Sequence, residues 1–129
     1  MKPSTPEWID KAEADFTTAQ RELRARRAPN FDDACFHAQQ CIEKYLKARL
    51  IEAAIAFPRS HDLEELLDLI LPHEPLWEVY RRELIRLSSF AVIFRYPGES
   101  ATRELAKNAV ASCKTIREAI RSSLGLSIS

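Results

Sequence analysis

Residues 32–56 contain neither glycine nor proline, and this stretch constrains the fold more than any other part of the chain. Its apolar side chains recur at every third or fourth position, which is the spacing of one face of an α-helix. They are Cys35, Ala38, Ile42, Tyr45, Leu46, Leu50 and Ala53. The spacing predicts a long amphipathic helix at the centre of a small all-α protein.

The polar side chains of the same stretch fall into two groups. At about 100° per residue, four of them share one stripe of the helix surface. They are His37, Gln40, Lys44 and Lys47. Gln39 and Glu43 lie nearer the apolar face, where a polar group needs a hydrogen-bond partner. We expect the two glutamines to bond across helices, and Glu43 and Lys47 to form a pair four residues apart.

Four further segments have the pattern of amphipathic helices. They cover residues 5–26, a short segment between Asp62 and Pro72, residues 76–94 and residues 100–124. Three of these helices have predicted caps at their starts: the Ser4–Glu7 capping box, Ser60 or Asp62, and Ser100. Gly125 is predicted to end the last helix. Together the segments predict one domain, residues 1–129, folded as an antiparallel up-and-down bundle of about five helices.

Two of these segments carry more specific predictions. In residues 76–94 a regular apolar face consists of Leu76, Tyr80, Leu84, Leu87 and Ala91. Residues 92–94 are interpreted as the last helical turn, because a strand without a partner leaves its backbone unsatisfied. The last helix has a basic face made of Arg103, Lys107, Lys114, Arg117 and Arg121. That face is interpreted as solvated; the alternatives are contact with an RNA backbone or an acidic partner.

Composition narrows the classes of function. The chain has 19 basic and 19 acidic residues, so its net charge predicts no strong attraction to nucleic acid or to an anionic membrane. No apolar run has the length of a signal peptide or membrane span. The three cysteines have no metal-binding spacing, which favours reduced thiols and a cytoplasmic location. No metal, cofactor or general catalytic motif is predicted.

Three ordered motifs resemble the signature of HEPN domain proteins. The first is the string from His37 to Ala48, the second is Ser60-His61-Asp62-Leu63, and the third is Phe94-Arg95-Tyr96-Pro97. The opening of the chain, with Trp8, Ala12, Asp15 and Ala19, also fits this family. The resemblance covers nearly the whole chain.

The resemblance implies a helical bundle that is commonly a homodimer and is linked to nucleotide or RNA binding. Small stand-alone members are often encoded beside a minimal nucleotidyltransferase, with which they form a toxin–antitoxin-like pair. An apolar surplus on the second and fourth helices also indicates a dimer. A nucleotidyltransferase, a nucleotide or an RNA are therefore the expected partners, and no membrane is expected.

One departure from the family pattern bears on catalysis. Ribonuclease members carry an arginine, a polar residue and then a histidine late in the chain, whereas the last histidine here is His73. No histidine follows Arg95 to act as a general base. A metal-independent ribonuclease toxin is therefore the disfavoured alternative, and a purely structural interaction module is the other.

The predicted site is a groove between the long helix and the turn at Arg95. The residues expected to contact phosphate or base are His37, Gln40, Lys44, Lys47, Arg95 and Tyr96. An arginine in a loop before a helix suits an anion. The alternatives are a surface or dimer-interface role for His37 and core packing for Tyr96. His61 and Asp62 are expected to cap a helix and fix its loop.

Overall fold

The described part of the chain is a bundle of five α-helices and two short 3₁₀ turns. The computed structural model describes residues 1–128; Ser129 lies outside the described residues. The elements are α1 Thr5–Arg24, α2 Phe31–Glu52, α3 Leu63–Ile70, η1 Pro75–Tyr80, α4 Arg81–Ser89, η2 Ile93–Arg95 and α5 Arg103–Ser123. No strand occurs in residues 1–128, which confirms the all-α prediction. In the same range, no helix combines the length and apolar character needed to cross a membrane.

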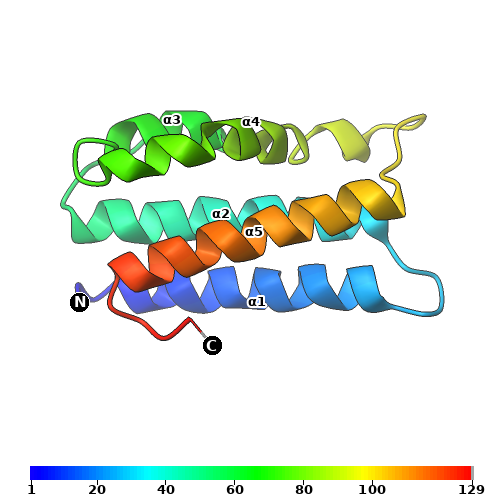
Figure 1. Ribbon diagram of the computed structural model, residues 1–129, viewed down its shortest axis with the longest axis horizontal. Helices are drawn as coiled ribbons and strands as arrows, with labels where there is room; N and C mark the ends of the chain where they lie inside the picture. Colours follow the sequence, from blue (N-terminus) through cyan, green and yellow to red (C-terminus); the bar gives the residue numbers. More distant parts are fainter. Residues whose placement is uncertain (129) are drawn as a thin grey trace.

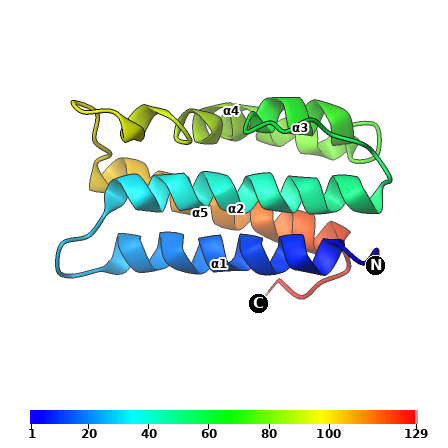
Figure 2. The same ribbon diagram turned by 180° about the vertical axis from the view of Figure 1, so that it is seen from behind.

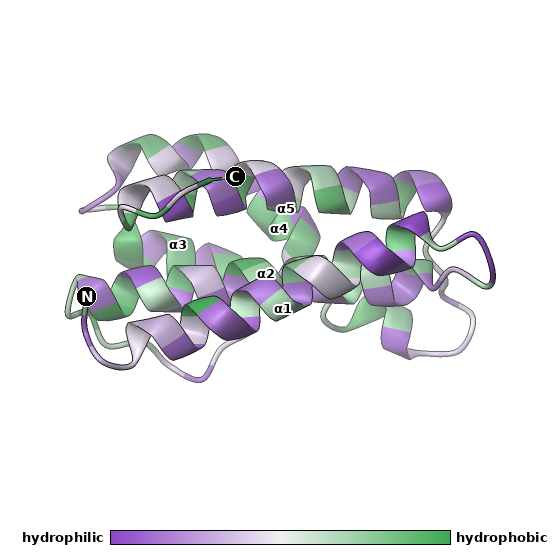
Figure 3. Cartoon of the chain, turned by 90° about the horizontal axis from the view of Figure 1, so that it is seen from below, coloured by the Kyte–Doolittle hydropathy of each residue, from purple (hydrophilic) through white to green (hydrophobic). Residues whose placement is uncertain are grey.

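α2 is the centre of the bundle. It contacts α1, α3, α4 and α5, and Figures 1 and 2 show it between α1 and the layer of α3 and α4, with α5 alongside. Ile42, Tyr45, Leu46 and Leu50 of α2 are fully buried. Figure 3 shows that polar and apolar residues alternate in sectors along the helices, as amphipathic elements require. The predicted central helix is therefore confirmed.

The sequence predicted the start of α2 more closely than its end. Asn30 caps its start by accepting a hydrogen bond from the backbone N–H of Asp33 at 3.0 Å. The helix ends at Glu52, several residues before the predicted end. Ala54 there has a φ of 58°, and the Ile55 N–H donates to the Leu50 carbonyl at 2.9 Å. The residue with positive φ at such a helix end is usually glycine. Because position 54 is an alanine, the sequence around it does not indicate that the helix ends there.

At the ends of the other helices, the residues predicted at two positions are confirmed and those predicted at two others are wrong. Asp62 caps α3 by accepting from the N–H groups of Glu64 and Glu65, as predicted. Gly125, with a φ of 76°, follows the end of α5 as predicted. The Ser4 side chain makes no capping hydrogen bond, so the predicted capping box is wrong. Thr102, and not Ser100, caps α5 through a bond from the Leu105 N–H at 3.1 Å.

The predicted helix over residues 76–94 is three separate elements. η1 begins at Pro75, α4 follows it, and Val92, with a φ of −123°, separates α4 from η2. A 3₁₀ turn has three residues per turn, so η1 changes the phase of the apolar face that a continuous α-helix would have. Leu76 is consequently 86% exposed, and Trp77 is only 8% exposed. The prediction that Leu76 belongs to the buried face is wrong.

The three cysteines are core residues. All three are buried and none is in a disulfide. Burial, together with the nearby charge of Asp32, raises the pKa of Cys35 to about 12. A thiol with this pKa is protonated at neutral pH and is a poor nucleophile or metal ligand.

The phase change at η1 leads to a stability prediction for two neighbouring residues. Trp77→Ala is expected to lower the free energy of unfolding by about 3–5 kcal/mol, because it removes a large buried side chain. Leu76→Ala is the matched control and is expected to change it by less than about 0.5 kcal/mol. Urea denaturation measures both. Equal losses for the two variants would mean that the phase of η1 is wrong.

Candidate functional site at the polar face of α2 and the η2 turn

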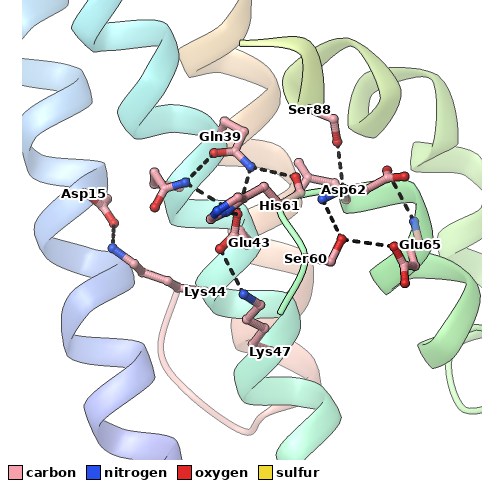
Figure 4. A network of polar contacts seen from close by, with 12 residues as sticks. Asp15, Gln39, Glu43, Lys44, Lys47, Ser60, His61, Asp62, Glu65 and Ser88 are labelled. Atoms are coloured by element: carbon pink, nitrogen blue, oxygen red, sulfur yellow. Dashed lines mark hydrogen bonds and ion pairs between the residues drawn. The ribbon is translucent and has the colours of Figure 1, made fainter. Parts of the chain in front are cut away.

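Glu43 is a buried carboxylate that gathers donors from α2 and from the loop after it. Its Oε1 accepts hydrogen bonds from the side-chain amides of Gln39 at 3.1 Å and Gln40 at 3.4 Å, and lies 2.8 Å from Nδ1 of His61. Its Oε2 accepts from the Lys47 ammonium at 3.0 Å, the predicted pair four residues apart. Figure 4 shows Gln39, Lys47 and His61 converging on Glu43. Gln39 and Glu43 therefore have the hydrogen-bond partners that their position requires. The expectation that the two glutamines bond across helices is wrong, because Gln40 bonds to Gln39 and Glu43 of the same helix, and Gln39 bonds to Glu43 and to the loop carbonyl of His61.

The surroundings of Glu43 favour its ionised form. Burial by itself raises the pKa of this carboxyl group. The hydrogen bonds from His61, Gln39 and Lys47, with the charge of Lys47, outweigh burial and hold the pKa below its ordinary value. Glu43 is thus a stable anion at neutral pH and an acceptor for all its neighbours.

Asp15 of α1 is the carboxylate that contacts the other two residues of the polar stripe, His37 and Lys44. Its Oδ1 lies 2.7 Å from Nδ1 of His37, and its Oδ2 accepts from the Lys44 ammonium at 2.5 Å. Asp15 is itself buried, so these contacts attach α1 to α2 where water is largely excluded. His37 and Lys44 are side by side, as predicted, and both already have an acidic partner.

Lys47 is held even more closely. Besides its ion pair with Glu43, its Nζ lies 5.6 Å from the centre of the Trp8 ring and 5.9 Å from that of Phe57. The side chain is buried. A cation between aromatic faces and a carboxylate is well stabilised within the protein. Lys47 therefore needs no external anion.

The loop before α3 is attached to α2 by His61. The His61 carbonyl accepts from the Gln39 amide at 3.1 Å, while its ring reaches Glu43. Ser60 accepts from the Asp62 N–H at 3.0 Å and donates to Glu65 at 3.0 Å. The His61 side chain is 73% exposed and borders an open groove of about 410 Å³ between this loop and α4. These contacts agree with a role for His61 and Asp62 in fixing the loop.

Arg95 and Tyr96 lie at the η2 turn, opposite the first turns of α2. The Arg95 guanidinium lies over the Phe36 ring at 4.7 Å from its centre and makes no ion pair with any described residue. Beside it is a cavity of about 240 Å³. The residues that line it are Asp32, Asp33, Phe36, Phe90, Phe94 and Arg95. Tyr96 is 63% exposed, so the alternative of a core position for it is wrong.

The aromatic lining of this cavity was missed by the sequence reasoning. Phe90 and Phe94 stack at 5.4 Å between ring centres with an angle of 27° between planes. The Phe36 ring also meets His37 edge to face at 5.3 Å, so the cavity adjoins one end of the polar stripe. The available signals were Phe36, a large aromatic residue outside the apolar face of α2, and Phe94, which stands beside Arg95 in the third motif.

The basic face predicted for α5 is partly internal. Arg117 is buried and forms two hydrogen bonds with Glu13 at 2.6 and 2.7 Å, with its guanidinium 4.4 Å from the centre of the Phe16 ring. Arg121 donates to the Tyr45 hydroxyl at 2.9 Å, and that hydroxyl donates to Glu13. The interpretation of Arg117 as part of a solvated face is wrong, because a carboxylate on α1 draws it inward. Arg103, Lys107 and Lys114 are exposed.

The comparison with protein families supplies the identification. A HEPN domain model matches residues 5–123, from the start of α1 to the end of α5. The chain belongs to the HEPN family. Neither a curated protein nor a solved structure matches it significantly. The match contains all three motifs that suggested HEPN, and it supports a role related to nucleotides or RNA.

Within residues 1–128, no group of three or more His, Cys, Asp or Glu side chains is placed to hold a metal ion. The chemistry available at the surface is that of an exposed guanidinium, an aromatic cavity and carboxylates. This is binding chemistry for a polar, partly aromatic ligand.

The anionic state of Glu43 predicts how stability depends on pH. A folded-state pKa below the unfolded value adds stability that is fully present above about pH 4.5 and is lost as pH falls through the folded value. Glu43→Gln is expected to cost about 1.5–3 kcal/mol at pH 7 and to reduce the loss of stability on acidification. Unfolding measured from pH 7 to pH 3 tests this.

The control for this experiment is Glu99→Gln, which removes an exposed carboxylate remote from Glu43 and should leave the profile close to wild type. If Glu43→Gln had the same stability and pH dependence as the wild-type protein, the network around Glu43 would not stabilise the fold.

Proposed function

We propose that this HEPN protein binds a phosphate of a nucleotide or of RNA beside the cavity between α2 and η2. The observation that carries the proposal is the Arg95 guanidinium, exposed, held over Phe36 and without an ion-pair partner in the described chain. Arginine has five donors in a planar fork that matches the oxygens of a phosphate. A guanidinium stacked on an aromatic ring is oriented before the ligand arrives.

The other cations near the polar stripe support this choice by contrast. Lys44 is paired with Asp15, and Lys47 with Glu43. Binding phosphate with either ammonium requires that it leave a carboxylate that is itself buried, which costs free energy. In the proposal Arg95 provides the anion contact, His37 and Tyr96 flank it, and the acidic partners hold Gln40, Lys44 and Lys47 in place.

A second candidate function is a protein interface on the η1–α4–η2 edge of the bundle (Figure 1). The large apolar side chains exposed there are Leu76, Val79, Ile85, Val92 and Ile93. A concentration of this kind is typical of an interface. It supports a homodimer, or a complex with the nucleotidyltransferase of a toxin–antitoxin-like pair. Light scattering distinguishes these: a monomeric mass for the isolated protein excludes the homodimer.

A metal-independent ribonuclease has less support. Arg95 is present, but no histidine follows it in the chain. A reaction at the RNA 2′-hydroxyl needs a general base within hydrogen-bond reach. RNA cleavage by pure protein that disappears in Arg95→Ala would restore this alternative.

The main proposal predicts the effect of Arg95→Ala on binding. With calorimetry and the four nucleoside monophosphates as probes, we expect the best ligand to bind about tenfold to a hundredfold more weakly, because a charge-assisted contact is lost. Arg82→Ala is the matched control: Arg82 is also exposed, on α4, and its loss should leave the affinity nearly unchanged. Equal affinities for wild type and Arg95→Ala would contradict the proposal.

A further inference from the structure

We propose that the cavity beside Arg95 holds the nucleobase and selects bases that carry an exocyclic amino group. The inference rests on the proposed function, since it takes Arg95 as the phosphate contact, and it adds the part of the ligand that gives specificity. The cavity combines aromatic walls, a carboxylate rim and a guanidinium, three features that face a single space.

The size and walls of the cavity suit a single base. Its volume of about 240 Å³ is below the roughly 300–1,000 Å³ typical of pockets for drug-sized ligands, which limits it to a fragment such as one ring system. Phe36 and Phe94 are half-buried, and Phe90, which is buried, stacks on Phe94. Bases stack on such rings because every base has a π face, so the walls provide affinity with little discrimination.

Discrimination comes from the two carboxylates at the first turn of α2. Asp32 accepts a hydrogen bond from the Ala101 N–H at 2.6 Å, which fixes it against the segment before α5. Asp33 is exposed, and its carboxylate accepts no hydrogen bond from any described residue. An ionised carboxylate is an acceptor only. It therefore favours an amino group on the base edge and disfavours a carbonyl oxygen at the same position.

The opposite charges across the cavity also orient the ligand. Arg95 offers donors only, so it attracts the phosphate, while Asp33 repels the phosphate and attracts the amino edge. The negative charge of Asp33 also stabilises α2, because it lies near the positive N-terminal end of the helix dipole. Any acidic residue in the first turn can have this role. That role alone predicts no difference between ligands, so a ratio of affinities separates the two functions of this side chain.

Cytidine and uridine monophosphates form the sharpest probe pair. They differ at the base by an amino group against a carbonyl oxygen, and both carry the same phosphate. We expect the wild-type protein to bind CMP about tenfold more tightly than UMP in calorimetric titrations. Inorganic phosphate should bind more weakly than CMP, because it makes no stacking contact.

Asp33→Asn tests the residue assigned to selectivity. The amide offers both a donor and an acceptor and carries no charge, so the ratio of CMP to UMP affinity should fall towards one, while UMP affinity stays the same or rises. Asp10→Asn is the control: it removes an exposed carboxylate on α1 and should leave the ratio unchanged. Phe36→Leu should weaken both ligands about tenfold. Melting temperatures establish that each variant is folded.

The outcomes separate this inference from the proposed function. Equal binding of CMP, UMP and inorganic phosphate, weakened by Arg95→Ala, overturns the base pocket and leaves the phosphate site. A CMP preference that survives Asp33→Asn overturns the assignment of Asp33. No binding of any of the three probes overturns both proposals.

Discussion

The buried carboxylate of Glu43 is the interaction on which the rest of this bundle depends. It lies on α2, which contacts the other four α-helices, and its donors come from α2 itself and from His61 in the following loop. A buried anion without these partners would be strongly destabilising. Because Glu43 must be satisfied, the polar residues of α2 and the Ser60–Asp62 loop form a single structural unit. Two motifs of the HEPN signature that are separate in sequence thus meet at one carboxylate (Figure 4).

Two carboxylates on α1 likewise bind donor side chains from neighbouring helices. Asp15 holds His37 and Lys44, while Glu13 holds Arg117 of α5. Burial raises the pKa of Glu13, but the hydrogen bonds from Arg117 and Tyr45 outweigh it and keep the pKa below its ordinary value. Most cations around the central helix are therefore already neutralised. Arg95 has no ion-pair partner among the described residues and also lines the cavity at η2, and these two features together locate the proposed binding site there.

Much of the architecture follows from sequence patterns that act locally. Apolar periodicity predicted the helices, and side-chain chemistry predicted the cap at Asp62 and the stop at Gly125. The failures arose where a distant or unusual partner decides the conformation. Ala54 adopts a backbone conformation that favours glycine, and Arg117 turns inward because Glu13, more than a hundred residues earlier in the chain, accepts its hydrogen bonds. Periodicity contains neither kind of information.

The same distinction applies to the candidate site. The polar stripe and Arg95 could be predicted, because a helix places the former and a motif marks the latter. The aromatic cavity could not, since Phe36 comes from α2 while Phe90 and Phe94 come from the segment around η2, and only the folded chain joins them. Sequence reasoning predicted the pair of Lys47 with Glu43 but not the contact of Lys44 with Asp15 of α1. In the proposal, both lysines support the site and do not contact the ligand.

The most direct test of this account is a map of amide chemical shifts by NMR while CMP is titrated into the ¹⁵N-labelled protein. We predict that the largest changes cluster at Asp33, Phe36, Phe94 and Arg95, with small changes at Lys47 and at His61. Changes centred instead on the groove beside His61, or on the exposed face of α5, would place the ligand site elsewhere and would contradict the proposed site beside Arg95.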